Sequence, residues 1–472
     1  DGAAGALGAL WVASLSWFRM ASVLLMSQIP ALLLGLIMVW AWLRWRKTRR
    51  AGWMLLIGGA AGWAAITRPV DALCYAIPIG VAIVWDLLRG ANQMHCPSLP
   101  PGEGRAEGKP GQTFGQRARR SQFPLTPTLS QGEREQEGRR ALSCSPPMIL
   151  ALLIVGAAPF LAIQLAFDKG VTGRWLETPF RMYLDRDAPG TQFGFPKYDA
   201  NARPQSVLPQ KQAYYKDWVV PYIRRHQPDQ LLTNWATRWL PMILDTTMPT
   251  RAMIPLTIVG LAGLTDRRRI VLWTTLPLLV LLYLFYTIFL EHYAIAVIPA
   301  IVMTGVLAVP TLGDAFPRFR RPIVAATAML ITASCVTSFW EINRRIAPPG
   351  RQIEDETFRS TLLREVNQDL PQASDLNKPA VILFRYHLGD NYFEEPVYNT
   401  DVAWPDDAPI IRAHDLGPRR DREIIDYYAA RHPPRTFYLF DPKASPAIVE
   451  LGTTRKPREL LETLDRTELG SK

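Results

Sequence analysis

The sequence predicts a mainly α-helical, polytopic transmembrane bundle with a small C-terminal α/β domain. Apolar runs alternate with stretches rich in Arg, Pro, Asp and Glu, although the mean hydropathy is only +0.01. A helix needs about 20 mostly apolar residues to cross the hydrocarbon core. Ile270–Leu290 carries no charge, and Ala294–Pro310, Pro322–Trp340, Met148–Phe167 and Ser27–Leu43 are nearly as apolar. These runs lack the polar face, at 3.6-residue spacing, of a soluble amphipathic helix.

Three basic clusters predict the topology, because Lys and Arg next to membrane spans mark the cytoplasmic side. They lie at residues 44–50, 267–269 and 318–321. With all three inside, residues 1–16 end a helix that leaves the cytoplasm and 17–26 form a short outer loop. The predicted spans are then residues 27–43, 52–67, 71–88, 148–167, 253–265, 270–290, 294–310 and 322–340. This path divides the chain into transmembrane helices at 1–89 and 148–342, with an extracytoplasmic loop at 168–252 and an extracytoplasmic domain at 343–472.

Residues 90–147 interrupt the membrane region on the cytoplasmic side. Their Pro, Gly, Arg, Glu and Gln content leaves little to bury, so we expect disorder. The stretch PLTPTLSQGEREQEGRR resembles translated intergenic repeat DNA of bacterial genomes. We interpret the segment as an insertion, tolerated because lengthening a loop costs little entropy. A basic recognition tail is the alternative.

The C-terminal residues 343–472 have the composition of a folded α/β domain. Ala380–Tyr386, Pro409–Ala413 and Thr436–Phe440 predict strands, and Arg419–Ala430 predicts a helix. Alternating strands and helices indicate a small α/β domain. The domain contains no GxGxxG motif and no P-loop, so the sequence predicts no nucleotide site.

Charge distribution and cysteine spacing argue against a nucleic-acid-binding protein and against a zinc-binding or disulfide-stabilised one. The net charge of +11 could indicate nucleic-acid binding, but the basic residues gather at the ends of apolar runs. They therefore favour contact with anionic membrane lipid, and no nucleic-acid partner is expected. The four cysteines form no CxxC pair, and Cys74 and Cys335 lie in apolar runs. No zinc site or disulfide framework follows from this pattern, and the sequence predicts no metal ligands.

Polar residues where spans end are the candidate binding site. Arg68 lies between two apolar runs, directly before the helix-breaking Pro69. His292 and Tyr293 follow the most apolar span, and Arg19 lies in the predicted outer loop. We expect these side chains to converge near the outer interface, where an Arg and a His would suit a phosphate or pyrophosphate. The alternative is that Arg68 and His292 only anchor the helices at the interface.

Three stretches carry a resemblance to a known family. Met20–Trp45, Ala61–Ile77 (AGWAAITRPVDALCYAI) and Glu291–Ala300 (EHYAIAVIPA) resemble the membrane glycosyltransferases of the GT-C fold. The most similar branch is the group of dolichyl-phosphate-mannose protein mannosyltransferases and lipid A aminoarabinose transferases. The outer segment Thr172–Phe195 is similar to a loop of some bacterial members. The resemblance covers roughly residues 3–340, and it rests on the order of its motifs, none of which is specific alone.

Residue matches connect this resemblance to the candidate site. In the family, a helix commonly ends in a Thr/Ala-Arg-Pro stretch, which Thr67, Arg68 and Pro69 match. A later span begins with an aromatic or basic pair before a Pro-containing helix, which His292 and Tyr293 match. The resemblance implies that a sugar moves from a polyprenyl phosphate to a glycan, lipid or protein acceptor at the outer face of the bacterial inner membrane. It also implies that basic residues, in some members with a divalent metal ion, stabilise the departing phosphate.

The resemblance does not match any residue of this chain to the family's catalytic base. In the family, a carboxylate of the first outer loop is the general base. This chain begins Asp-Gly-Ala-Ala, without the features of a signal peptide, and its first apolar stretch is too short to span. We therefore expect an N-terminally truncated chain whose catalytic loop would lie upstream. The outer carboxylates of this chain are Asp71, Asp185, Asp187 and Glu291. None of them matches that base.

Two other functions remain as alternatives. A transporter or flippase of a lipid-linked saccharide should have broken or charged helices near the bilayer midplane and internal repeats. The sequence indicates neither. A non-enzymatic membrane scaffold would use the C-terminal domain to bind a partner. The large segments predicted outside the cytoplasm favour the transferase.

Overall fold

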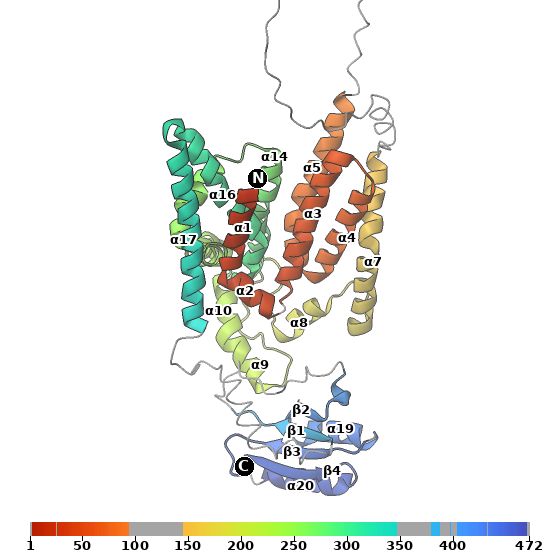
Figure 1. Cartoon of the computed structure of the whole chain (residues 1–472). Coiled ribbons are helices and arrows are strands. Elements are labelled where there is room, and N and C mark those ends of the chain that lie inside the picture. Colours follow the sequence, from red (N-terminus) through yellow and green to blue (C-terminus); the bar gives the residue numbers. More distant parts are fainter. Residues whose placement is uncertain are drawn as a thin grey trace, which may run out of the picture. The chain divides into compact units, whose positions relative to one another are not determined.

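The computed structural model describes residues 2–24, 26–93, 145–346, 379–387, 397, 404–431 and 433–469. The described chain is mainly helical and has a small C-terminal sheet (Figure 1). It divides into two compact units, of which unit 1 comprises residues 1–176, 239–283 and 290–339. Unit 2 comprises residues 177–238, 284–289 and 340–472. Residues 94–144 lie outside the described part, so the predicted disorder of the insert stays a prediction.

Five described helical segments are long and apolar enough to cross a membrane. They are Gln28–Thr48 (α3), Pro69–Arg89 (within α5, Pro69–Gln93), Pro146–Thr172 (α7), Glu291–Ala315 (mostly α16, Ile298–Ala315) and Pro317–Trp340 (mostly α17, Arg320–Ile346). A sixth segment is formed if α1 (Gly2–Ser14) and α2 (Ser16–Val23), which are bent by 68°, count as one span. By length and composition, these segments confirm the predicted multi-pass membrane protein.

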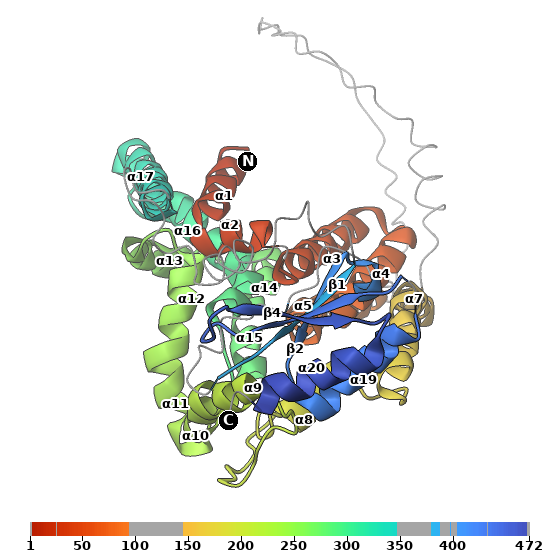
Figure 2. The same cartoon turned by 90° about the horizontal axis from the view of Figure 1, so that it is seen from below.

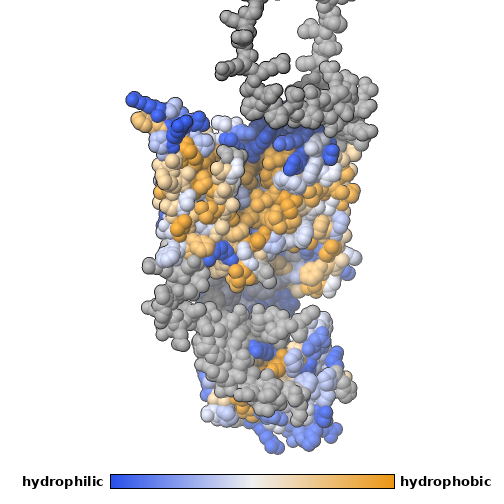
Figure 3. All heavy atoms as spheres, in the orientation of Figure 1, coloured by the Kyte–Doolittle hydropathy of each residue, from blue (hydrophilic) through white to orange (hydrophobic). Residues whose placement is uncertain are grey.

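The surface of unit 1 is apolar where a bilayer would contact it. Along α7, large hydrophobic side chains are exposed on almost every turn, including Leu150, Ile154, Leu161 and Phe167. Figure 3 shows hydrophobic residues over much of the visible face of this unit. A soluble protein rarely exposes so much contiguous apolar surface, whereas lipid tails solvate it well.

Small residues allow α4 (Gly52–Thr67) to pack closely against α7. Gly58 and Gly62 are four residues apart on α4, and they face the backbone of Leu153 and Ala157 on α7. Gly156 of α7 in turn faces the backbone of α4. Apolar helices in lipid gain little from hydrophobic burial against each other, so close backbone contact between small residues holds them together.

The predicted span Ile270–Leu290 is not a single helix, which corrects the expectation for this run. The run forms α14 (Arg267–Trp273) and α15 (Thr275–Tyr283), and it has no regular helix from residue 284 to 290. Pro277 explains the break because it cannot donate a hydrogen bond to the turn that ends α14. The hydroxyl of Thr274 donates to the carbonyls of Ile270 (3.0 Å) and Val271 (2.8 Å), so carbonyls at the break have hydrogen-bonding partners.

Three more predicted segments differ from the structure. Residues 17–26 were expected to form a loop, but α2 occupies most of them. The expected span 253–265 is only the short helix α13 (Ile254–Leu261) followed by turns. The expected loop 168–252 begins later, because α7 extends to Thr172. It contains the helices α8 (Pro179–Asp187), α9 (Pro209–Tyr214), α10 (Val220–Arg225), α11 (Leu231–Asn234) and α12 (Leu240–Thr247).

A buried histidine organises the part of unit 2 that follows α8. The ring of His226 stacks on Phe195 with centroids 4.8 Å apart, and its Nε2 donates to the carbonyl of Gly194 at 2.9 Å. The backbone N–H of Gly194 donates to the carbonyl of Phe285 at 2.7 Å. Burial lowers the pKa of His226, because protonation would place a charge in this apolar setting.

The C-terminal sheet has the order β2-β1-β3-β4. The strands β1 (Ala380–Phe384), β2 (Ile410–His414) and β3 (Thr436–Phe440) are parallel, and β4 (Ile448–Thr453) is antiparallel to β3. α19 (Pro418–Ala429) and α20 (Pro457–Leu469) lie side by side on one face of the sheet (Figure 2). The predicted α/β character is confirmed, but β4 and α20 were missed.

The side chains of β1 alternate between the two faces of the sheet. Val381 and Leu383 of β1 point into the core under the helices, whereas Ile382 and Phe384 point to the other face. All five residues of β1 are buried. The first face packs against the two helices, and the second packs against Phe440 and Val397, which explains why β1 is apolar throughout.

We expect Gly58→Ala to destabilise unit 1 by about 1–3 kcal/mol, because the added methyl group would collide with the carbonyl of Leu153. The matched control is Gly80→Ala in α5, where a Cβ would meet nothing within 4 Å. Thermal unfolding in detergent measures both variants. Equal melting temperatures for the two variants would contradict close packing of α4 on α7.

We expect the segment around Gly194 to open as the pH falls below about 6.5, the ordinary pKa of histidine. The unfolded segment then binds a proton that the folded segment excludes, so stability that is complete above this pH is lost below it. Hydrogen exchange of residues 191–198 at pH 7.5 and 5.5 measures the opening. The non-titrating variant His226→Gln should show no added opening at pH 5.5, and an identical pH response in both proteins would refute the assignment.

Candidate functional site

Arg68 lies at the junction of two helices. Its N–H donates to the carbonyl of Ala64 at 2.7 Å and so ends α4, and its carbonyl accepts from the N–H of Ala72 at 2.9 Å and so starts α5. Pro69 is the first residue of α5, a position where a missing N–H costs nothing. The Arg68 side chain is only 16% exposed, so the helix break places a charged group inside the bundle.

Asp71 and Tyr283 hold this guanidinium in one orientation. Arg68 Nε donates to Asp71 Oδ2, and Arg68 Nη2 donates to the hydroxyl of Tyr283 at 3.1 Å. The Tyr283 hydroxyl donates in turn to Asp71 Oδ1 at 2.8 Å. The carboxylate is almost completely buried, at 3% exposure. Both charges are therefore compensated, and α15 is tied to the start of α5.

Aromatic rings surround this ion pair. The Arg68 guanidinium lies over the ring of Tyr293, 4.8 Å from its centroid, and Tyr293 stacks on Tyr283 at 5.3 Å. His292 meets Tyr293 edge-on at 4.7 Å. Both residues belong to the 3₁₀ segment Glu291–Val297 that precedes α16. We call Arg68, Asp71, Tyr283, His292 and Tyr293 the Arg68 cluster.

The structure brings together three of the four binding residues expected from the sequence, namely Arg68, His292 and Tyr293. The fourth, Arg19 of α2, lies over the ring of Phe339 in α17, 4.3 Å from its centroid. Asp71 and Tyr283 were not expected to join the site. The spacing of Arg68 and Asp71 across a helix start could have indicated their pairing, but no local signal places Tyr283 beside them.

Two of the other carboxylates have partners within unit 2. Asp185 accepts from the side-chain amide of Gln192 at 2.8 Å, and Asp187 accepts from the ammonium of Lys211 at 3.3 Å. Within the described part of the chain, no three His, Cys, Asp or Glu side chains gather as metal ligands. The Arg68 cluster itself offers one carboxylate, already bonded to Arg68 and Tyr283, so its residues do not fit the divalent ion of some GT-C enzymes.

A second polar group lies at the carboxyl ends of the parallel strands in the C-terminal sheet. Arg385 Nε, after β1, donates to Asp415 Oδ2, after β2, at 2.6 Å. His387 Nε2, also after β1, donates to Asp441 Oδ1, after β3, at 2.7 Å. Burial alone would raise the pKa of Asp441, but the hydrogen bond from His387 leaves it lowered. In open α/β sheets, ligands bind at this edge, where the chain order reverses.

The chemistry available at the Arg68 cluster is recognition of an anion. Two N–H groups of Arg68 are used by Asp71 and Tyr283, and among the described residues no side chain accepts from Nη1. The edge formed by Nη1 and the second Nη2 hydrogen can still bind two oxygens of a phosphate or carboxylate. His292 and Tyr293 lie beside the guanidinium and can add hydrogen-bond donors.

Comparisons with protein-family models, with curated proteins and with solved structures found no match to this chain.

We expect Asp71→Ala to destabilise the protein by about 3–5 kcal/mol, because Arg68 would keep a buried charge without its partner. The control is Asp245→Ala, which removes the ionic partner of Arg251 at an exposed position. Exposed ion pairs contribute little, so this control should melt like the parent protein. Thermal unfolding in detergent measures both variants. A parent-like melting temperature for Asp71→Ala would show that the ion pair is not structurally required.

Proposed function

We propose that the protein is a membrane glycosyltransferase that moves a sugar from a polyprenyl phosphate to an acceptor at the outer face of a bacterial inner membrane. The observation that carries this proposal is Arg68, held by Asp71 and Tyr283 with one hydrogen-bonding edge left for a ligand. The resemblance of the Thr67-Arg68-Pro69 and His292-Tyr293 stretches to GT-C enzymes supports the same assignment.

The proposed role of Arg68 is to stabilise the leaving group. A sugar phosphodiester carries one negative charge, and the departing lipid phosphate gains a second as the glycosidic bond breaks. A fixed guanidinium stabilises this added charge without reorganising, because Asp71 already sets its orientation. His292 can donate a further hydrogen bond, and Tyr293 covers one face of the guanidinium.

The proposed sidedness follows from the two ends of α5. Arg68 precedes its first residue, whereas Asp86 near its other end pairs with Arg46 at 2.9 Å, and Arg267 lies over the ring of Trp85. Two of the three basic clusters therefore meet at the end of α5 that is opposite to Arg68. Basic residues favour the cytoplasmic side, so Arg68 is assigned to the outer side.

One observation favours transport of a lipid-linked saccharide as a second candidate. The α14–α15 segment is broken at Thr274, and α1 and α2 form a bent pair. Discontinuous helices are typical of secondary transporters, and the sequence alone did not indicate these breaks. The two candidates differ in product, because a transporter moves its lipid between leaflets of a proteoliposome and leaves the glycosidic bond intact.

We expect the purified protein to bind undecaprenyl phosphate, and Arg68→Lys to weaken binding almost as much as Arg68→Ala. Lysine supplies a point charge but not the edge of two parallel donors. Native mass spectrometry of the full chain in detergent measures the bound lipid. The control Arg251→Ala removes an exposed arginine of unit 1 and should bind normally. Normal binding by Arg68→Ala would leave Arg68 as a structural residue and refute the proposed site.

We also expect a cysteine at the exposed position 445 to react with an impermeant thiol reagent in intact cells. The variant is Ser445→Cys, in a background where the natural Cys96 and Cys144 are replaced. The same reagent should reach a cysteine at position 96 only after the cells are permeabilised. Labelling at 96 but not at 445 in intact cells would invert the proposed topology.

A further inference from the structure

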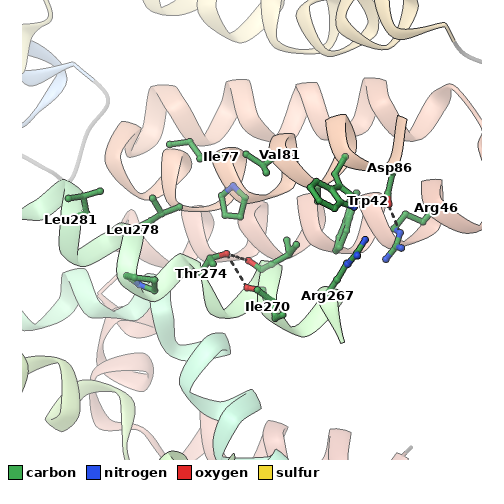
Figure 4. A pocket seen from close by; sticks show the side chains of 15 residues that line it. Trp42, Arg46, Ile77, Val81, Asp86, Arg267, Ile270, Thr274, Leu278 and Leu281 are labelled. Carbon is green, nitrogen blue, oxygen red and sulfur yellow. Dashed lines mark hydrogen bonds and ion pairs between the residues drawn. The ribbon is translucent and has the colours of Figure 1, made fainter. Parts of the chain in front are cut away.

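A groove in unit 1 lies at the opposite end of α5 from the Arg68 cluster. It has a volume of about 520 Å³ and is lined by α3, α5, α14 and α15 (Figure 4). Its wall is almost entirely apolar, with Ile77, Val81, Leu278 and Leu281 among the lining residues. Small-molecule sites commonly have volumes of about 300–1,000 Å³, so the groove can hold a sizeable ligand.

One end of the groove is charged and aromatic. Arg46 and Asp86 form an ion pair of 2.9 Å there, with side chains 26% and 13% exposed. Arg267 lies over the exposed ring of Trp85, 5.1 Å from its centroid, and makes no ion pair with a described residue. The three charged groups that line the groove therefore sum to one positive charge. A ligand that fits this groove is apolar along its length and anionic at one end.

The length of the groove can be compared with the thickness of one leaflet. Ile77 and Asp86 are nine residues apart on α5, which corresponds to about 14 Å at about 1.5 Å per residue. Ile270 and Leu281 are eleven residues apart along α14 and α15, which corresponds to at most about 17 Å. Both lengths are close to half of a hydrocarbon core of about 30 Å. The groove therefore matches one acyl chain of a single leaflet.

We propose that this groove binds one anionic phospholipid, with an acyl chain along α5 and α15 and the phosphate at Arg267. Arg267 is suited to this role because its two neighbours are engaged elsewhere. Arg268 lies 4.0 Å from Asp266, and Arg269 donates to the carbonyl of Gly263 at 2.7 Å. Arg267 alone of the three lines the groove. Thr274, at the break between α14 and α15, lines one wall, and a bound chain would pack against it (Figure 4). This site is separate from the proposed polyprenyl-phosphate site and does not depend on it.

The test is native mass spectrometry of the full chain in detergent with added phosphatidylglycerol or phosphatidylcholine of identical acyl chains. We expect one tightly bound phosphatidylglycerol and binding of phosphatidylcholine that is about tenfold weaker. Arg267→Gln should weaken phosphatidylglycerol binding by about tenfold, since hydrogen bonds to charged groups are worth at least this factor. Arg268→Gln removes the same charge from the same helix and should change nothing.

A second pair of variants tests the apolar part of the groove. Val81 and Val84 are both exposed on α5, but only Val81 lines the groove. Val81→Trp should fill the groove and abolish the tightly bound lipid, whereas Val84→Trp should not. Asp86→Asn should strengthen phosphatidylglycerol binding, because it removes a negative charge and releases Arg46.

Four results would overturn the proposal. Equal binding of the two phospholipids would show unspecific solvation by lipid. Equal losses in Arg267→Gln and Arg268→Gln would show a general effect of surface charge. Retained binding in Val81→Trp would place the lipid elsewhere. A dimer that excludes lipid, and is lost in Val81→Trp, would show that a second copy of the chain occupies the groove.

Discussion

The buried ion pair of Arg68 and Asp71 is the interaction on which the arrangement of unit 1 depends. It lies where α4 ends and α5 begins, so it sets the turn between these two neighbouring helices. Tyr283 bonds to both partners and thereby fixes the end of α15. An isolated charge inside a bilayer is costly, and a paired charge with a hydroxyl bridging both partners is tolerable. The same interaction that stabilises the turn also fixes the orientation of the guanidinium.

Breaks in apolar helices are the second recurring feature of this bundle. Lipid cannot satisfy a free backbone carbonyl or amide, so each break needs partners within the protein. At the break between α14 and α15, the hydroxyls of Thr274 and Thr275 donate to the carbonyls of the preceding turn. Near the start of the 3₁₀ segment, the hydroxyl of Thr246 donates to the carbonyl of Glu291. Such irregular backbone is where a membrane protein can expose polar groups to a ligand.

The two ends of α5 differ in their chemistry. At its start, an arginine is compensated by a buried carboxylate and enclosed by tyrosine rings. Near its other end, an arginine without an ionic partner among the described residues lies at the mouth of an apolar groove. In the proposed transferase, the first arrangement would discriminate by geometry, since few orientations of a phosphate fit a fixed guanidinium. In the proposed lipid site, the second would attract an anionic headgroup, with the acyl chain supplying much of the binding energy.

The amino-acid sequence by itself determined the mainly helical membrane character, most of the spans and three strands of the C-terminal sheet. These features follow from apolar runs and local alternation, which are properties of neighbouring residues. It also indicated Arg68, His292 and Tyr293, because polar groups at helix ends are visible in a linear sequence. Only the tertiary structure decided that Ile270–Leu290 breaks into two helices and that Tyr283 completes the ion pair of Arg68. The physical reason is that the Tyr283 contact joins residues 215 positions apart, and such a contact depends on how helices pack.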